Sequence, residues 1–456
     1  MLSIDKNKID YLNKKSIDIL DSIQEFEIET KNKSYDHIND SISNKPYTNL
    51  TDEILKDVPF RISTQDSITE RRLSVKEVFQ DREYGFDESN YEVLIKFIKT
   101  ILKDKKINDI ISFEFLLNKT LEWLFSAYLK KQISECFTDF IMHEMNDSVK
   151  EHDILFPTDR LEISGRFDIG GVTLLFIGKD YIDSLERDYI KNEENPNLTY
   201  YKHIRDSYQG GVFICTSVKA EFSKAVGIAF AKCSLAVDLL KICSYATSNP
   251  EYRISFDLSK KMKGKIYNEF LVQDKKKPYF FKINKESTMR VHMLDSVTWQ
   301  VALDMGIERF NNFIANKNEL NCELYIMIEN SIRRLSEALS KSDLNQRTVE
   351  IFTILESLLL NDENSPILDS LTKYCSKLVT KDIRERKEII NLIKNMYKVR
   401  SNLVHHAINR QFDVKDLGKL QFIIFSLIIT LIDKLDYHKN KISILNEIDD
   451  AIVNAY

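Results

Sequence analysis

The chain has few of the residues that interrupt helices. Its 456 residues include only 11 glycines and 7 prolines, roughly a third of the usual share. These two residue types are the least favourable in helix interiors, so their scarcity favours long helices over a loop-rich β protein. A chain of this length is too long for one ordinary hydrophobic core, which predicts two or three domains.

The sequence also has no apolar run long enough to cross a membrane. The longest run, residues 422–432, is well short of a bilayer span and contains Ser426 and Thr430. We expect it to form a helix buried among other parts of the protein. The first residues, MLSIDKNKIDYLNKK, have no apolar signal core. These absences predict a cytoplasmic protein without a membrane partner.

The patterns of metal and phosphate-loop sites are missing as well. None of the cysteines forms a Cys-x-x-Cys pair, and the histidines show no His-Glu-x-x-His spacing. Neither Gly170-Gly171 nor Gly210-Gly211 is followed by the Lys-Ser/Thr of a phosphate loop. The sequence therefore predicts no metal and no cofactor. We expect buried reduced thiols at all six cysteines, because several lie in apolar periodic runs: Cys136, Cys215, Cys233, Cys243, Cys322 and Cys375.

An excess of positive charge is absent too. The 65 Lys and Arg residues against 70 Asp and Glu give a net charge of −5. No global field attracts nucleic acid, so any RNA contact must come from a local patch. The basic clusters at 275–277 and 260–265 are candidates for phosphate contacts, but charges in loops and at strand edges more often serve solubility.

Residues 1–150 are predicted to be mostly helical. A helix near the start is followed by a polar, Ser/Asn/Asp-rich connector that extends to about residue 86. Residues 88–150 then show apolar residues at helical spacing. Trp123 and Phe125 lie in this stretch, and the spacing favours packing in a core over a platform for stacking bases. The sequence does not indicate a function for this region.

Residues 151–318 change towards strand patterns. Residues 161–168 alternate, Gly170-Gly171 marks a turn and residues 172–177 are apolar, which predicts a hairpin. No strand–helix–strand rhythm requires a parallel sheet, so a small α+β module is predicted. Its other expected elements are a strand at 210–216, a helix at about 221–245 and a strand pair at 265–272 and 278–283.

Residues 319–456 show helical periodicity in every segment. Short connections between the expected helices predict a bundle. The fold class is therefore mostly α, with a central α+β module and a C-terminal all-helical bundle. The helices are expected at 320–340, 344–360, 366–379, 382 to about 403, 414–435 and 442–453.

The most informative stretch is Tyr397-Lys-Val-Arg400-Ser-Asn402-Leu-Val-His405-His406, at the end of a strongly periodic helix. Arginine fits phosphate oxygens in a bidentate way, and histidine moves protons near neutral pH. The alternative is an ordinary helix C-terminus, where cations favour the negative end of the dipole. Five steps turn a helix by about 500°. Arg400 and His405 therefore share a site only if the helix ends or bends between them, or if two chains contribute.

Together these features resemble the HEPN domain, an all-helical family of RNases and RNA-binding modules. Its hallmark is an arginine followed four to six residues later by a histidine, at the end of a core helix. The resemblance covers the last 135 or so residues and is closest to the Apea-like branch. It rests on Ile354-Leu-Glu356-Ser-Leu-Leu, on the run from Ile393 to His405 and on the apolar helix after it.

The resemblance implies a metal-independent endoribonuclease that cuts RNA through attack of the 2′-hydroxyl, leaving a 2′,3′-cyclic phosphate. Arg400 would bind the scissile phosphate, and His405 would serve as acid or base. Asn402 would position phosphate or orient the histidine. Glu356 would hold Arg400 or His405, although an unrelated half-buried ion pair explains it equally well. His406 also fits the spacing, so the choice between the two histidines stays open.

HEPN domains commonly dimerise with their motif helices at the two-fold axis. The resemblance therefore implies a homodimer through the C-terminal bundle, in which a second His405 supplies the other half of the acid–base pair. It also implies an antiviral abortive-infection effector or a toxin, whose residues before 319 sense a phage or regulatory trigger or choose the RNA. The alternative is a catalytically silent HEPN module that dimerises and binds RNA or a protein partner.

Two positions depart from the family pattern. Ser401 follows Arg400 where many members have Asn, Asp or His, which leaves the role of the amide at Asn402 open. Ala407 stands where one toxin class carries a tyrosine that a partner nucleotidyltransferase modifies. Regulation by that route is therefore not expected.

Overall fold

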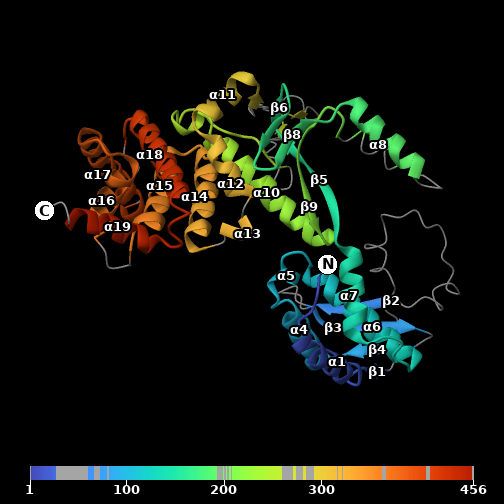
Figure 1. The fold of residues 1–456 in the computed structure, drawn as a ribbon. Coiled ribbons are helices and arrows are strands. Elements are labelled where there is room, and N and C mark those ends of the chain that lie inside the picture. Colours follow the sequence, from blue (N-terminus) through green and yellow to red (C-terminus); the bar gives the residue numbers. More distant parts are fainter. Residues whose placement is uncertain are drawn as a thin grey trace. The chain divides into compact units, whose positions relative to one another are not determined.

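The structure is a computed structural model of the 456-residue chain (Figure 1). It divides into two compact units, residues 1–152 with 218–227 and residues 153–217 with 228–456. The predicted central module and the predicted bundle thus lie largely in the same, second unit. The described residues are 2–26, 60–65, 72–79, 82–192, 199, 202, 205–206, 208–258, 271–273, 281–283, 292–315, 317–320, 322–361, 366–406 and 411–453.

The first unit is built on helices, most of which are capped at the first turn by a short polar side chain. The helices are α1 (Lys6–Leu20), α4 (Glu88–Ile101), α5 (Lys105–Asn108), α6 (Phe113–Lys130) and α7 (Phe137–Ser148). The side chains of Asp87 and Ser112 accept backbone N–H groups at the starts of α4 and α6, as N-caps do. Trp123 and Phe125 are buried in the core, which confirms their predicted packing role.

A four-stranded antiparallel sheet completes the first unit. Its strand order is β1-β4-β3-β2, from β1 (Gln24–Phe26), β2 (Phe60–Gln65), β3 (Arg72–Phe79) and β4 (Arg82–Phe86). The prediction of a loose polar connector up to residue 86 is therefore wrong over β2, β3 and β4. In β3 the buried Glu77 lies on the same face as the fully buried Val75, so charged and apolar residues do not alternate cleanly along the strand. Gly85 lies so close to the Val75 carbonyl that a Cβ would not fit.

The second unit contains a five-stranded sheet of order β10-β5-β9-β8-β7. The predicted hairpin is confirmed only around its turn: residues 167–169 pair antiparallel with β8, and Ile169 lies opposite Val172, whereas residues 161–163 of the predicted first arm form a separate strand. Gly170 and Gly171 make the turn with positive φ values of 55° and 80°, a conformation that suits glycine. The strands are β5 (Lys150–Asp159), β7 (Phe167–Ile169), β8 (Val172–Phe176), β9 (Val212–Ala220) and β10 (Asp257–Leu258).

Two further strand pairs accompany this sheet. β11 (Leu271–Gln273) pairs antiparallel with β12 (Phe281–Ile283), which confirms the ends of the predicted pair. Its other residues, and the basic clusters at 275–277 and 260–265, lie outside the described residues. β6 (Leu161–Ile163) and β13 (His292–Leu294) form a parallel pair that the sequence analysis did not predict. Such a pair joins segments far apart in the chain, and no local pattern marks it.

The central module also contains helices. α10 (Phe222–Ile242) confirms the helix predicted at about 221–245. The others are α8 (Lys179–Asn192), η2 (Tyr245–Thr247), α11 (Ser296–Asp304), η3 (Ile307–Arg309), α12 (Phe310–Ala315) and α13 (Lys317–Leu320).

The C-terminal bundle contains a helix at each predicted segment. α18 packs against four of the other helices and has a nearly all-apolar buried surface, so it is central as predicted. Within the described part of the chain, no helix is long and apolar enough to cross a membrane. The bundle helices, orange to red in Figure 1, are α14 (Glu323–Ser340), α15 (Leu344–Leu359), α16 (Ile367–Val379), α17 (Ile383–His406), α18 (Val414–Asp433) and α19 (Lys441–Val453).

A buried arginine connects the central module with the bundle. Arg347 on α15 is 0% exposed and donates hydrogen bonds to the carbonyl oxygens of Pro250, Leu339 and Lys341. Burial, with a smaller effect of Arg253, lowers the pKa of Arg347 to about 10. The side chain remains a cation at neutral pH and ties three chain segments together.

The cysteine prediction holds only in part. All six thiols are free, and Cys233, Cys243 and Cys375 are buried. Cys215 and Cys322 are half-buried, and Cys136 is exposed, so burial at every position is wrong. Cys136 precedes the first residue of α7, outside that helix's apolar stripe, and its Sγ lies 2.9 Å from Asp139 Oδ2.

Candidate functional site

The whole Arg–His motif lies on one continuous helix. α17 extends to His406, three residues beyond the predicted end at about residue 403. Ile393, Met396 and Val399 are buried on one face of it, and the helix packs against α15 and α16. The motif is therefore placed by the bundle core, on an element with fixed geometry.

Arg400 is held by two partners. Its Nη2 lies 3.0 Å from Glu356 Oε1 on α15 and 3.2 Å from Oε2. The guanidinium also lies over the ring of Tyr397, 5.5 Å from the centroid, a distance suited to a cation–π contact. Tyr397 in turn meets Phe352 edge-on, with ring centroids 5.4 Å apart. An acid and an aromatic stack thus orient the arginine.

The Glu356–Arg400 pair is mostly shielded from water. The two side chains are 16% and 19% exposed, and an ion pair in such surroundings is stronger than one at the surface. Arg400 Nε is buried and has no hydrogen-bond partner among the described residues. An unused buried donor is uncommon in folded proteins.

The histidines lie in the last turn of α17. His405 and His406 are exposed, with ring centroids 6.5 Å apart. At about 100° per residue, His405 points about 140° around the helix axis from Arg400, and His406 about 120°. The helix continues without a break from Arg400 to the histidines. Within one chain the cation and the imidazoles therefore face different directions.

Asn402 belongs to the histidine side of the helix. It is half-buried and lies about 60° from His405 but about 160° from Arg400. Two roles were predicted for Asn402, positioning phosphate and orienting a histidine. From this position it would act beside the histidines and not beside Arg400. The predicted residues thus fall into an arginine face, with Glu356, and a histidine face, with Asn402.

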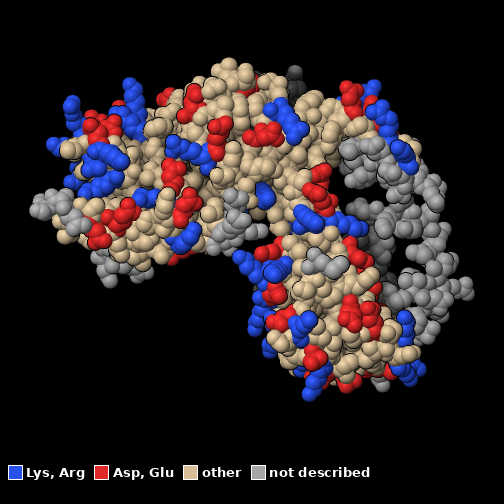
Figure 2. Space-filling view, in the orientation of Figure 1, with Lys and Arg blue, Asp and Glu red and all other residues tan. Residues whose placement is uncertain are grey.

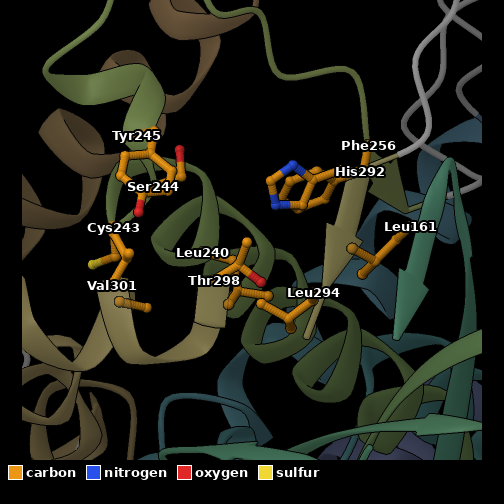
Figure 3. A pocket seen from close by; sticks show the side chains of 11 residues that line it. Leu161, Leu240, Cys243, Ser244, Tyr245, Phe256, His292, Leu294, Thr298 and Val301 are labelled. Atoms are coloured by element: carbon orange, nitrogen blue, oxygen red, sulfur yellow. The ribbon is translucent and has the colours of Figure 1, made fainter. Parts of the chain in front are cut away.

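A small pocket elsewhere in the second unit is a weaker candidate (Figure 3). It is lined by Cys243, Ser244, Tyr245, Phe256 and His292, among others, and its cavity volume is about 20 Å³, enough for about one water molecule. The His292 ring stacks on Phe256 at 4.8 Å, and burial lowers the pKa of His292. No predicted site residue lines this pocket, and a nucleotide does not fit it.

A larger polar hollow lies between α14 and α15. Its volume is about 560 Å³. Arg333 is already engaged there, with Nη2 2.8 Å from Glu329 Oε1, and the wall also carries Glu337 and Glu350. Charges of both signs make it a poor phosphate site. In the described residues, no group of three or more His, Cys, Asp or Glu side chains is arranged to hold a metal ion.

Comparisons with known proteins give no direct guide to function. No family model, no curated protein and no solved structure matches the chain. Function is therefore argued from the residues and geometry of the site rather than from relatives.

Proposed function

We propose that the protein is a metal-independent endoribonuclease of HEPN type. The observation that carries the proposal is the arrangement at the end of α17: Arg400 is oriented by Glu356 and Tyr397, while His405 and His406 are exposed in the same last turns. A fixed guanidinium and free imidazoles are the groups that phosphodiester cleavage needs when no metal takes part.

The reaction uses the nucleophile that RNA itself carries. A histidine removes the 2′-hydroxyl proton, and the oxygen attacks the neighbouring phosphorus. Arg400 stabilises the charge that builds on the non-bridging oxygens of the pentacoordinate state. The bond from phosphorus to the 5′-oxygen then breaks, and a second histidine protonates that leaving oxygen. The products are a 2′,3′-cyclic phosphate and a 5′-hydroxyl.

Two copies of the chain are needed to assemble this site. On a straight α17 the histidine face points about 140° away from Arg400, so one chain does not bring the two groups to one phosphate. A two-fold axis near the end of α17 brings His405 of the partner subunit to the arginine. Val404, between the two faces, is 49% exposed, which suits a position at such an interface.

The biological setting follows the same resemblance. We place the enzyme in the cytoplasm as an abortive-infection effector or a toxin, which acts on RNA once a phage or regulatory trigger is present. The first unit, with its separate core, is the part assigned to sensing that trigger. This assignment is tested by asking whether residues 1–152 are needed for inhibition of growth but not for cleavage.

A second function is favoured by the same ion pair. Glu356 already neutralises Arg400, and a neutralised guanidinium attracts phosphate less strongly than a free one. A HEPN module that dimerises and holds RNA or a protein partner without cutting it has no need of a free arginine. This alternative predicts RNA binding or dimerisation with no change in RNA length.

The test compares matched variants in one assay. Arg400→Ala and His405→Ala should abolish RNA cleavage by the purified protein and relieve growth inhibition on overexpression, and wild-type cleavage should survive EDTA. Arg334→Ala and His143→Ala serve as controls, because both residues are exposed and neither has a role in the proposed reaction. Equal activity of all four variants would overturn the proposal.

A further inference from the structure

One face of α17 carries a row of polar and basic residues that ends at His405. The spacing between successive members is three or four residues, which keeps them on one side of a helix. The members are Arg384, Lys387, Asn391, Lys394, Lys398, Asn402 and His405. We call the four cations of this row, Arg384, Lys387, Lys394 and Lys398, the basic stripe.

The stripe is straight and long. All members of the row lie within about 60° of the direction of His405 around the helix axis. From Lys387 to His405 the helix rises by about 27 Å. Arg400 and the ion pair with Glu356 lie on another face, so the basic stripe approaches the histidines without crossing the arginine site.

The cations of the stripe have no partners among the described residues. All four are exposed, and within the described part of the chain none of their side chains forms an ion pair or a hydrogen bond. Other bundle lysines do, as in the pairs Lys373–Asp449 at 2.6 Å and Lys434–Glu447 at 3.0 Å. The same helix also carries two acids, and both lie outside the stripe. Glu385, opposite His405, accepts a hydrogen bond from Thr380, and Glu388 lies about 100° from His405.

The charge is concentrated where this helix reaches the surface. Figure 2 shows Lys and Arg side chains gathered at the end of the bundle, over the place that α17 occupies in Figure 1. The whole chain carries a net charge of −5, so the patch is a local exception. A local positive row on an acidic protein attracts polyanions to one place, whereas a uniformly basic surface does not select a place.

We infer that the basic stripe is a track for the backbone of single-stranded RNA, which it delivers to His405. This inference rests on the proposed function for the identity of the polyanion. Unpartnered lysines in a row contact successive phosphates and release counterions, which supplies affinity without sequence preference. The row contains no aromatic side chain on which a base stacks, so contacts to phosphates and not to bases are expected.

The shape of the stripe favours a single strand over a duplex. The major groove of A-form RNA is deep and narrow, and protein side chains do not read it. An α-helix therefore does not enter it. On a duplex the phosphates of each strand wind away from a straight line, and only a short part of the stripe makes contact. An extended single strand follows the whole length of about 27 Å from Lys387 to His405.

The experiment measures RNA binding separately from cleavage. Binding of a fluorescent single-stranded RNA of about 20 nucleotides is followed by anisotropy at several salt concentrations, in the His405→Ala/His406→Ala background, which leaves the RNA intact. Lys387→Gln, Lys394→Gln and Lys398→Gln are combined in the test variant. The control combines Lys103→Gln, Lys105→Gln and Lys106→Gln, which change the net charge equally at exposed positions of the first unit. Circular dichroism verifies that each variant is folded.

The test variant should bind about tenfold or more weakly at low salt, and the slope of log affinity against log salt should fall by about 2, from three lost phosphate contacts. The control should bind like the unmodified protein. The same RNA paired with its complement should bind more weakly than the single strand. Equal losses in both variants, unchanged binding in the test variant or no RNA binding at all would overturn the inference. If binding depends on the stripe but no RNA is cut in the wild-type background, the proposed enzyme fails and the track stands.

Discussion

Two helices of the bundle, α14 and α17, use the same kind of residue in opposite ways. Arg333 on α14 contacts Glu329 at 2.8 Å and Asp238 of α10 at 3.4 Å. Asp238, which is 3% exposed, also accepts a hydrogen bond from Ser336 at 2.8 Å. On α17 only Arg400 has an acidic partner within the described residues. Arg333 of α14 is thus engaged within the fold, whereas the four exposed cations of the basic stripe on α17 remain available to a ligand.

The difference lies in burial and partnership, not in residue type. A shielded ion pair is costly to break, because the remaining charge stays buried without a partner. An exposed lysine without a partner contributes little to stability. Its removal should therefore weaken the binding of RNA without changing the free energy of unfolding. Arg400 stands between the two cases, since it has an acidic partner but lies beside the exposed histidines.

The largest effect is expected at Arg400. Arg400→Lys keeps the charge but loses the planar fork that fits phosphate, so single-turnover cleavage should fall by about a hundredfold or more. The melting temperature should change little, because lysine can still pair with Glu356. Cleavage within threefold of wild type would place the arginine outside the chemistry. Arg334→Lys, at an exposed arginine of α14, is the matched control.

On α14 the effect should appear in stability instead. Arg333→Met leaves Glu329 and Asp238 without this partner and should lower the free energy of unfolding by about 2–4 kcal/mol. Urea denaturation measures this change, and Lys394→Met on α17 should change the same quantity by less than about 0.5 kcal/mol. Cleavage per folded molecule should be unchanged in Arg333→Met. Equal stability of the two variants would remove the contrast between the helices.

The α14 network should also make stability depend on pH. Burial acts to raise the pKa of Glu329, but hydrogen bonds from Lys317 and Arg333 outweigh it and hold the pKa below its ordinary value of 4.5. The stabilisation is therefore fully present above pH 4.5 and is lost as the pH falls through the lowered pKa. Urea midpoints between pH 7 and pH 3 should show this loss. Glu329→Gln should remove most of this dependence of the urea midpoint on pH, whereas Glu388→Gln on α17 should leave the dependence unchanged.

The smallest effect is expected from one stripe residue. Lys394→Gln removes a single phosphate contact, so RNA affinity should weaken about two- to fivefold, and the salt slope should fall by about 0.7. Fluorescence anisotropy measures both, and Lys419→Gln, a 71% exposed lysine of α18, is the control. A loss as large as that of the triple variant would show that the three lysines do not act as separate contacts.

The sequence predicted the helices better than the strands. Apolar residues at helical spacing mark α6, α10 and the helices of the bundle, because each buries one face against a core. β2, β3 and β4 were missed because charged residues hide their alternation. The parallel β6–β13 pair joins distant segments, and local spacing carries no information about it.

The candidate site was predicted in its residues but not in its geometry. The sequence named Glu356 as a partner of either Arg400 or His405, and only the fold shows that it pairs with Arg400. The sequence placed the end of α17 at about residue 403. It therefore did not show that the helix continues through His406, which puts Arg400 and the histidines on different faces. The basic stripe was not predicted, although Lys387, Lys394 and Lys398 recur at helical spacing. Whether such lysines lack partners is decided by the neighbouring helices, and the sequence does not show it.

The chemistry of the cut ends tests the central claim most directly. A single-stranded RNA and a copy with 2′-deoxyribose throughout are incubated with the purified protein and EDTA, and the products are analysed by mass spectrometry. The account predicts that only the RNA is cut, that its new ends are 2′,3′-cyclic phosphate and 5′-hydroxyl, and that His405→Ala removes both products. Cutting of the deoxy strand, or 5′-phosphate ends, would contradict it.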